Sequence, residues 1–373
     1  SNVQVQLCSI ECCTLHAIDD PQCQQNQSFC QDMEGWSKIC KNIFVWNYNT
    51  NFFYYDLPFP NYRSIGFNIR FFEKNNTKGL FMQANAYGNN GEMCDLRNYV
   101  LSRCLWNPSL DGWEMVQEFC RLHYGTAADA ILEYVNKLCD RTEREGWHPS
   151  CFPRPIEMGL TPDFSKELFS IFQKGIALAE TPEIRQRVEK ASMCSYRAII
   201  ESCGQIRFEK DRLWMSWPAP WDLMIDRYET LCKKYNVTKA TEHMDMSDFL
   251  EQLHRVREEG IPAIRLENET WRLTAIPEQN GTVMEMTYKP TGRNLAYDPV
   301  IGGMGKLFNE RVFKENIVNG FDPNDPAEYQ GKVEDSTLTL TRKQTDGSSL
   351  IRIIELKPDS PKTLFCRSVI THR

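Results

Sequence analysis

The segment Asn42-Ile43-Phe44-Val45-Trp46-Asn47-Tyr48 is a short apolar run, and it predicts a β-strand. The sequence on either side alternates between two spacings, period two for strands and near 3.6 for helices. These spacings predict strands at residues 3–8 and 79–83, and helices at residues 29–41, 63–74 and 92–106. The first hundred or so residues therefore read as three consecutive strand–helix units.

Strands that alternate with helices in this way predict an α/β fold with parallel strands and right-handed crossovers. A (β/α)₈ barrel and a doubly wound sheet both satisfy the pattern. A barrel needs roughly 250 residues, so only its last three units would fit in this region. We therefore expect residues 1–110 to be the C-terminal part of a (β/α)₈, TIM-like barrel, with the beginning of the gene product upstream of Ser1.

Two further regions follow. Residues 111–262 predict an α-helical domain in which Asp111 caps the first helix and Pro182 starts a later one. The predicted helices are residues 113–124, 127–145, 165–179, 182–203, 220–235 and 247–258. Residues 263–373 predict a β-sandwich, expected to be incomplete, with hairpin signals at Asn280-Gly281 and Asp346-Gly347. Its predicted strands are residues 271–276, 282–288, 337–342 and 349–356.

Composition narrows the class of ligand. The net charge is −7 and no cluster of Lys and Arg is present, which argues against nucleic acid and anionic membranes as partners. Aromatic residues make up 12% of the chain, and their flat apolar faces suit sugar rings. No stretch of about 18 apolar residues occurs, so no transmembrane segment is predicted.

The chain holds fifteen cysteines, an odd number, without a paired CxxC spacing. This scatter argues against a zinc site, and we expect reduced thiols that act as small core residues. The sequence thus predicts neither a metal nor a cofactor.

A set of short motifs resembles a known bacterial family. The motifs are Cys8-Ser9-Ile10-Glu11-Cys12-Cys13, Trp46-Asn47-Tyr48-Asn49-Thr50-Asn51-Phe52, Leu57-Pro58-Phe59-Pro60-Asn61, Asn68-Ile69-Arg70-Phe71-Phe72, Gly79-Leu80-Phe81, Gly91-Glu92-Met93, Leu96-Arg97, Leu105-Trp106-Asn107-Pro108, and Tyr124-Gly125 followed by Ala127-Ala128. They are similar to the family catalogued as domain of unknown function 4838, over roughly the first 145 residues. The resemblance implies a glycoside hydrolase with a (β/α)₈ barrel related to α-glucuronidases and β-hexosaminidases, often followed by a helical domain.

The C-terminal region is similar to the opening of galactose-mutarotase-like sandwich domains, through Trp271-Arg272-Leu273, Thr282-Val283 and the run from Pro290 to Leu295. The N-terminal resemblance has two departures. Family members commonly read Trp-Asp-Tyr where this chain has Trp46-Asn47-Tyr48, and carry a carboxylate or a second Gly around residues 81–84.

The active site of a barrel lies at the carboxyl ends of its strands, so the residues after each strand are candidates. The catalytic candidates are Glu11 and Glu92, and the substrate-binding candidates are His16, Trp46, Asn47, Tyr48, Asn51, Gln83 and Asn85. Glu11 lies between Ile10 and Cys12, which predicts the apolar setting that suits a general acid.

Each candidate also has a structural explanation. Glu11 could be salt-bridged, His16 could be a hydrogen-bonding residue of the fold, and Trp46 could belong to the core. Glu92 could simply complement a helix N-terminus. Glycoside hydrolysis generally needs two carboxyl groups about 5 to 9 Å apart, and these strands alone do not supply a convincing pair. In related barrels the main acid is carried on the fourth strand, which here would lie upstream of Ser1.

The leading interpretation is an O-glycosyl hydrolase that acts on a polysaccharide or oligosaccharide. The first alternative is a non-catalytic carbohydrate-binding protein with a degenerate glycosidase barrel, and the second is a scaffolding module without carbohydrate affinity. The sugar, the linkage and the oligomeric state stay open. The localisation also stays open, since a periplasmic or exported bacterial protein would need a signal outside this chain.

Overall fold

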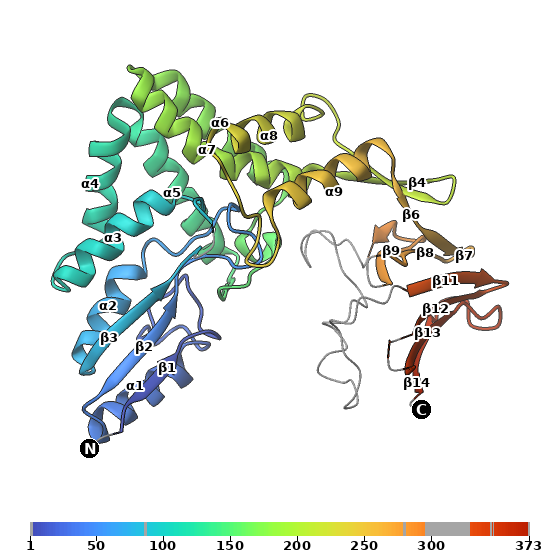
Figure 1. The fold of residues 1–373 in the computed structure, drawn as a ribbon, viewed down its shortest axis with the longest axis horizontal. Helices are drawn as coiled ribbons and strands as arrows, with labels where there is room; N and C mark the ends of the chain where they lie inside the picture. The colour runs from blue at the N-terminus through green and yellow to red at the C-terminus, as the bar shows by residue number, and fades with distance from the viewer. Residues whose placement is uncertain are drawn as a thin grey trace. The chain divides into compact units, whose positions relative to one another are not determined.

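The computed structural model describes residues 3–85, 88–278, 281–294, 329–343, 345 and 347–371. The chain divides into two compact units (Figure 1). Unit 1 comprises residues 1–203 and 219–251, and unit 2 comprises residues 204–218 and 252–373. Within the described ranges the fold is mixed α/β, with two three-stranded and two four-stranded sheets. The predicted α/β character is therefore confirmed.

Unit 1 contains a parallel sheet built from β1 (Val5–Cys8), β2 (Ile43–Tyr48) and β3 (Thr77–Gln83), in that order. Both pairings are parallel, with Val45 opposite Leu7 on one side and opposite Leu80 on the other. The three predicted strands and their parallel arrangement are confirmed. All three carboxyl ends consequently meet at one edge of the sheet, visible as the blue strands of Figure 1.

Two crossover helices, α1 (Gln27–Ile39) and α2 (Ile65–Lys74), cover one face of this sheet. Met33 of α1 and Phe72 of α2 are fully buried in one cluster with Ile43 and Val45 of β2. Burial alternates strictly along β2, because successive strand side chains point to opposite faces. Trp46 and Tyr48 therefore lie on the face opposite to α1 and α2.

The remaining helices of unit 1 follow the predicted positions closely. They are α3 (Cys94–Trp106), α4 (Gly112–Tyr124), α5 (Ala128–Arg144), α6 (Pro162–Leu178), α7 (Pro182–Cys203) and α8 (Met224–Lys234), with short 3₁₀ turns η1 (Gly125–Ala127) and η2 (Pro155–Met158). Asp111 caps α4 as predicted, since its side chain accepts hydrogen bonds from the backbone N–H groups of Trp113 and Glu114. Pro182 opens α7, also as predicted.

One large core joins these helices to the end of the sheet. Val100 of α3, Val116 of α4 and Ile131 of α5 are buried in the same cluster as Ile69 of α2. The predicted boundary between residues 110 and 111 thus falls inside a single compact unit. The assignment of residues 1–110 to a barrel and of 111–262 to a separate helical domain stays a prediction.

A β-hairpin interrupts the region predicted to be helical throughout. β4 (Gln205–Glu209) pairs antiparallel with β5 (Arg212–Ser216), which pairs with β6 (Ile261–Pro262). The two turn residues, Lys210 and Asp211, both have positive φ. Hairpin turns of this kind usually contain Asn-Gly or Asp-Gly, so this turn carried no recognisable sequence signal. α9 (Met246–Glu258) precedes β6.

Two antiparallel sheets complete unit 2. The first contains β7 (Ile264–Glu267), β8 (Trp271–Ile276), β9 (Thr282–Tyr288) and β10 (Arg293–Asn294). The second contains β11 (Tyr329–Glu334), β12 (Thr337–Lys343), β13 (Ser349–Glu355) and β14 (Phe365–Thr371). Side chains from both sheets share one buried cluster, including Leu273 of β8 and Leu340 of β12. The sandwich of residues 263–373 stays a prediction, and Asn280, Leu295 and Asp346 lie outside the described residues.

Two findings concern the whole of the described chain. All fifteen cysteines lie within it, and none of them forms a disulfide there. Among its helices, none combines the length and the apolar character that a membrane crossing requires.

Candidate functional site

The candidate site is the carboxyl edge of the β1-β2-β3 sheet, where the loops after the three strands carry the predicted residues. Loops at this edge hold the active sites of most parallel α/β proteins. The structure does not gather the predicted residues into one site. It distributes them among a partly exposed aromatic surface, a buried amide chain, a buried carboxylate network and a group of thiols and imidazoles.

The aromatic surface consists of Trp46, Tyr48, Phe81 and Gln83, and we call it the aromatic face. The Trp46 indole N–H donates a hydrogen bond to the Gln83 side-chain oxygen at 2.6 Å. The Trp46 and Tyr48 rings are stacked, with centroids 6.0 Å apart and planes 16° apart. Phe81 meets Trp46 edge-on at 5.2 Å and is 54% exposed. Three of the four residues were predicted; Phe81 was missed, although its position two residues before Gln83 puts it on the same face.

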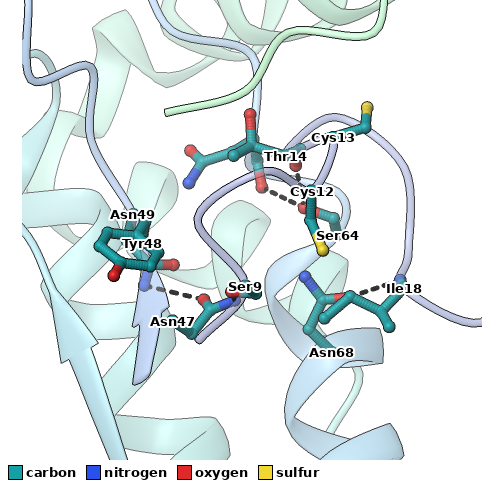
Figure 2. A pocket seen from close by; sticks show the side chains of 11 residues that line it. Ser9, Cys12, Cys13, Thr14, Ile18, Asn47, Tyr48, Asn49, Ser64 and Asn68 are labelled. Atoms are coloured by element: carbon teal, nitrogen blue, oxygen red, sulfur yellow. Dashed lines mark hydrogen bonds between the residues drawn. The ribbon is translucent and has the colours of Figure 1, made fainter. Parts of the chain in front are cut away.

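Asn47 lies on the opposite face of β2 from Trp46. Figure 2 shows its side chain donating to the Ser9 hydroxyl, at 2.9 Å, and accepting a hydrogen bond from the Asn49 side chain at 3.1 Å. These groups line a cavity of about 10 Å³, which has room for a water molecule but not for a sugar ring. The expectation that Trp46 and Asn47 line one sugar site is therefore corrected, because neighbouring strand residues point in opposite directions.

Asn51 and Asn85 hold loop backbone. Asn51 is buried and donates to the Pro153 carbonyl at 3.0 Å, while its oxygen accepts from the Phe53 N–H. Asn85 donates to the carbonyls of Gly88 and Asn90 in the turn that follows β3. These contacts explain both amides structurally, and the predicted substrate-binding role of each stays a prediction.

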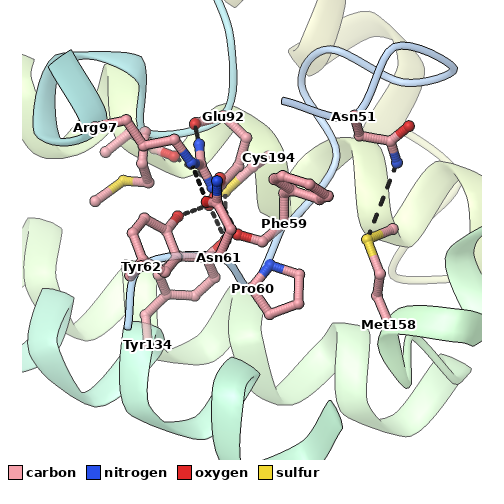
Figure 3. A network of polar contacts seen from close by, with 12 residues as sticks. Asn51, Phe59, Pro60, Asn61, Tyr62, Glu92, Arg97, Tyr134, Met158 and Cys194 are labelled. Carbon is pink, nitrogen blue, oxygen red and sulfur yellow. Dashed lines mark hydrogen bonds and ion pairs between the residues drawn. The ribbon is translucent and has the colours of Figure 1, made fainter. Parts of the chain in front are cut away.

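Glu92 is buried, rather than placed at an open strand mouth as predicted. Figure 3 shows Tyr62, Tyr134 and Arg97 around its carboxylate. Both tyrosine hydroxyls donate to Oε1, and Arg97 Nη2 lies 2.5 Å from Oε2. Burial raises the pKa of both tyrosines well above the usual value, so both stay protonated and able to donate. Three donors thus occupy the carboxylate, which explains Glu92 as a structural residue of the interior.

Glu11 occupies the loop after β1 and is exposed, as is its neighbour Ile10. The predicted apolar setting is therefore wrong, because only Cys12, of its two neighbours, turns into the interior. Glu11 is nevertheless a carboxylate at the candidate edge whose side chain is accessible to solvent. Its catalytic role stays a prediction.

His16 lies beside two cysteines and a second histidine. Its Nδ1 is 3.2 Å from the Cys13 sulfur, and the Nδ1 atom of His148 is 3.3 Å from the Cys23 sulfur. Hydrogen bonds from Cys13 and from both imidazoles lower the pKa of the Cys23 thiol below its ordinary value, although burial acts in the opposite direction. These four side chains could hold a metal ion, although the scattered spacing of the cysteines argued against a zinc site.

The sequence contained part of this signal. Cys13, His16 and Cys23 follow a C-x₂-H-x₆-C spacing, which differs from a paired CxxC motif. The fourth residue, His148, comes from the segment after α5 and could be found only in the folded chain.

The N-terminal part of the chain is similar to a known family. Residues 1–136 match the family described as Domain of unknown function (DUF4838). The resemblance predicted from the motifs is thereby confirmed. No curated protein matches the sequence. Among solved structures, a 4-alpha-glucanotransferase from Thermococcus litoralis matches with 11% identity and a TM-score of 0.21, over 74% of this chain and 39% of that one. A TM-score this low does not indicate a common fold.

Proposed function

We propose that this chain belongs to a carbohydrate-active protein of the glycoside-hydrolase class, and that its aromatic face lines the sugar site. The observation that carries the proposal is the hydrogen bond between Trp46 and Gln83 on the partly exposed side of a parallel sheet. Trp46 and Tyr48 offer stacked rings, and Phe81 extends the same apolar surface outward. Aromatic faces beside a fixed amide provide both the apolar contact and the hydrogen bonds that a sugar ring requires.

The position of the aromatic face supports a barrel. Parallel sheets are nearly always covered on both faces. In unit 1, α1 and α2 cover the face that holds Ile43 and Val45, as helices cover the outside of a (β/α)₈ barrel. The face that holds Trp46 then corresponds to the inside of the barrel, and its side chains would contact a ligand at the carboxyl edge.

The net charge of −7 agrees with a neutral ligand. For hydrolysis, Glu11 is the acid or base that we propose, because it is the exposed member of the predicted pair at this edge. A specific observation favours the second candidate, a sugar-binding protein without hydrolytic activity. Glu92, the other predicted carboxylate, is occupied by two tyrosines and an arginine, so it supplies no free second carboxyl.

Binding is tested with a glycan array followed by calorimetry on the best oligosaccharide. Replacing Trp46 by Ala removes the central ring, and we expect at least about fivefold weaker binding, since an aromatic contact contributes about 1 kcal/mol or more. Trp36 of α1 provides the matched control, because it is 39% exposed and belongs to a different surface. Absence of glycan binding, or an equal loss in Trp36→Ala, would contradict the proposal.

Hydrolysis is tested separately with aryl glycosides and aryl uronides. Turnover that falls in Glu11→Gln while oligosaccharide binding is kept would identify Glu11 as a catalytic carboxylate. Binding without turnover in the wild type would support the non-catalytic candidate instead.

A further inference from the structure

The loop after β1 and the segment after α5 bring two cysteines and two histidines together. The ligand atoms of Cys13, His16, Cys23 and His148 all lie within 4.8 Å of one another. Cys13 and Cys23 are buried, His16 is half-buried and His148 is exposed. This group is independent of the aromatic face, and nothing in the proposed function requires it.

We propose that Cys13, His16, Cys23 and His148 bind one Zn²⁺ ion in a tetrahedral site. Two thiolates and two imidazoles are a ligand set characteristic of structural zinc. The observed sulfur–nitrogen distances are 3.2 Å for Cys13–His16 and 3.3 Å for Cys23–His148. Zinc bond lengths of about 2.3 Å to sulfur and 2.0 Å to nitrogen put the edge of such a tetrahedron at about 3.6 Å. Small side-chain adjustments therefore bring all four atoms to bonding distance.

The backbone around the ligands is held in place by contacts that need no metal. Asn26 is completely buried, and its side chain accepts from the Cys13 N–H at 2.7 Å. The same amide donates to the carbonyls of Cys13, His16 and Ala17. A single side chain thus fixes the loop that carries the first two ligands, as outer hydrogen bonds do in many metal sites.

Two further hydrogen bonds position the fourth ligand, His148. The Thr14 N–H and hydroxyl both donate to the Pro149 carbonyl, at 2.7 and 2.9 Å. Thr14 follows Cys13 and Pro149 follows His148, so these bonds join the two segments directly beside the proposed ion. The ligands are therefore brought together across 125 residues by the fold itself.

Four protein ligands leave no open position for a substrate or a water, so the proposed zinc is structural. The zinc would link the loop that carries Glu11 to the segment from His148 to Pro153. The Pro153 carbonyl accepts a hydrogen bond from the Asn51 side chain. The metal would thus stabilise the carboxyl edge of the sheet without taking part in chemistry there.

Cys12 provides a matched control. It is buried and adjacent to Cys13, but Figure 2 shows its sulfur on the side of Asn68 while the Cys13 sulfur turns away. Burial, the largest effect, raises the pKa of the Cys12 thiol to about 12, as expected for an inert core thiol. Replacing Cys12 by Ser should leave metal binding unchanged.

The experiment measures metal content of the full chain, purified under reducing conditions, by elemental mass spectrometry. We expect close to one zinc per chain in the wild type and in Cys12→Ser, and loss of zinc in Cys23→Ser and His148→Gln. His148 is exposed, so its variant should keep the fold, which circular dichroism checks. Exchange with Co²⁺ should produce the absorption of tetrahedral cobalt with thiolate ligands.

Three results would overturn the proposal. The first is a wild type that takes up no zinc and gives no tetrahedral cobalt spectrum after incubation with either ion. The second is an equal loss of metal in Cys12→Ser and Cys23→Ser. The third is a Cys13–Cys23 disulfide, found by peptide mapping, in protein that was kept reduced throughout.

Discussion

Arg97 and Glu92 form an ion pair inside unit 1, with side chains only 5% and 1% exposed. Arg97 also donates to the Asn61 side chain and to the Phe59 carbonyl, so its guanidinium is hydrogen-bonded in several directions. Such a pair contributes little net stability relative to apolar residues, but removal of one partner leaves the other charge buried. The ion pair and these hydrogen bonds account for Glu92 and Arg97 as structural residues, without a catalytic role.

The first prediction concerns this pair. Glu92→Gln should lower the free energy of unfolding by about 3 to 5 kcal/mol, because Arg97 would keep a buried, uncompensated charge. Glu167→Gln is the control, since the Glu167–Lys137 pair is exposed and should contribute less than about 1 kcal/mol. Urea unfolding followed by circular dichroism measures both. Equal effects of the two substitutions would show that Glu92 is not the structural carboxylate described above.

The second prediction concerns the close approach of α2 and the start of α4. A Cβ atom added at Gly66 would lie 2.9 Å from backbone atoms of Gly112, which cannot move like a flexible side chain. Gly66→Ala should therefore destabilise the chain by about 1 to 3 kcal/mol. Gly35 of α1 is a helical glycine with open space around it, so Gly35→Ala should be neutral or stabilise by up to about 1 kcal/mol. Thermal unfolding distinguishes the two, and similar melting temperatures would contradict the packing.

The third prediction concerns acid sensitivity. His123 stacks on Phe119 with ring centroids 4.6 Å apart, and burial together with nearby Arg187 lowers its pKa below the usual 6.5. Protonation therefore favours the unfolded state. The stability that neutral His123 contributes is complete above pH 6.5 and is lost as the pH falls through its lower folded-state pKa. His123→Phe keeps the ring and removes the titration, so its stability should decline less between pH 7 and 5. If the free energies of unfolding of the wild type and of His123→Phe fall equally between pH 7 and 5, the lowered pKa of His123 would be contradicted.

The fourth prediction concerns the cap of α4. The Asp111 carboxylate accepts from Trp113 N–H at 2.7 Å and from Glu114 N–H at 3.1 Å. Asp111→Ala should cost about 0.5 to 2 kcal/mol, whereas Asp111→Asn should retain most of the stability because an amide oxygen also caps. Chemical unfolding of the two variants measures the difference. An Asn variant as unstable as the Ala variant would mean that charge, rather than the hydrogen bonds, is decisive.

Much of the fold was predictable because the signals are local. The spacing of apolar residues predicted β2 and the helices of unit 1 within a few residues, and Asp111 predicted the start of α4. The hairpin of β4 and β5 was missed because its turn residues, Lys210 and Asp211, are not typical of such turns. The site was less predictable. Trp46 and Gln83 lie on neighbouring parallel strands, with Gln83 two residues beyond Phe81, the partner of Trp46, and their side chains are hydrogen-bonded.

By itself, the sequence determined the order of strands and helices in unit 1, the parallel sheet and the family resemblance of residues 1–136. Those properties depend on side-chain periodicity and on motifs along the chain. Only the tertiary structure decided that Glu92 is buried between two tyrosines and an arginine, and that His148 meets Cys23. Both outcomes depend on how segments far apart in the sequence pack, because burial and ligand geometry arise from contacts that no local pattern encodes.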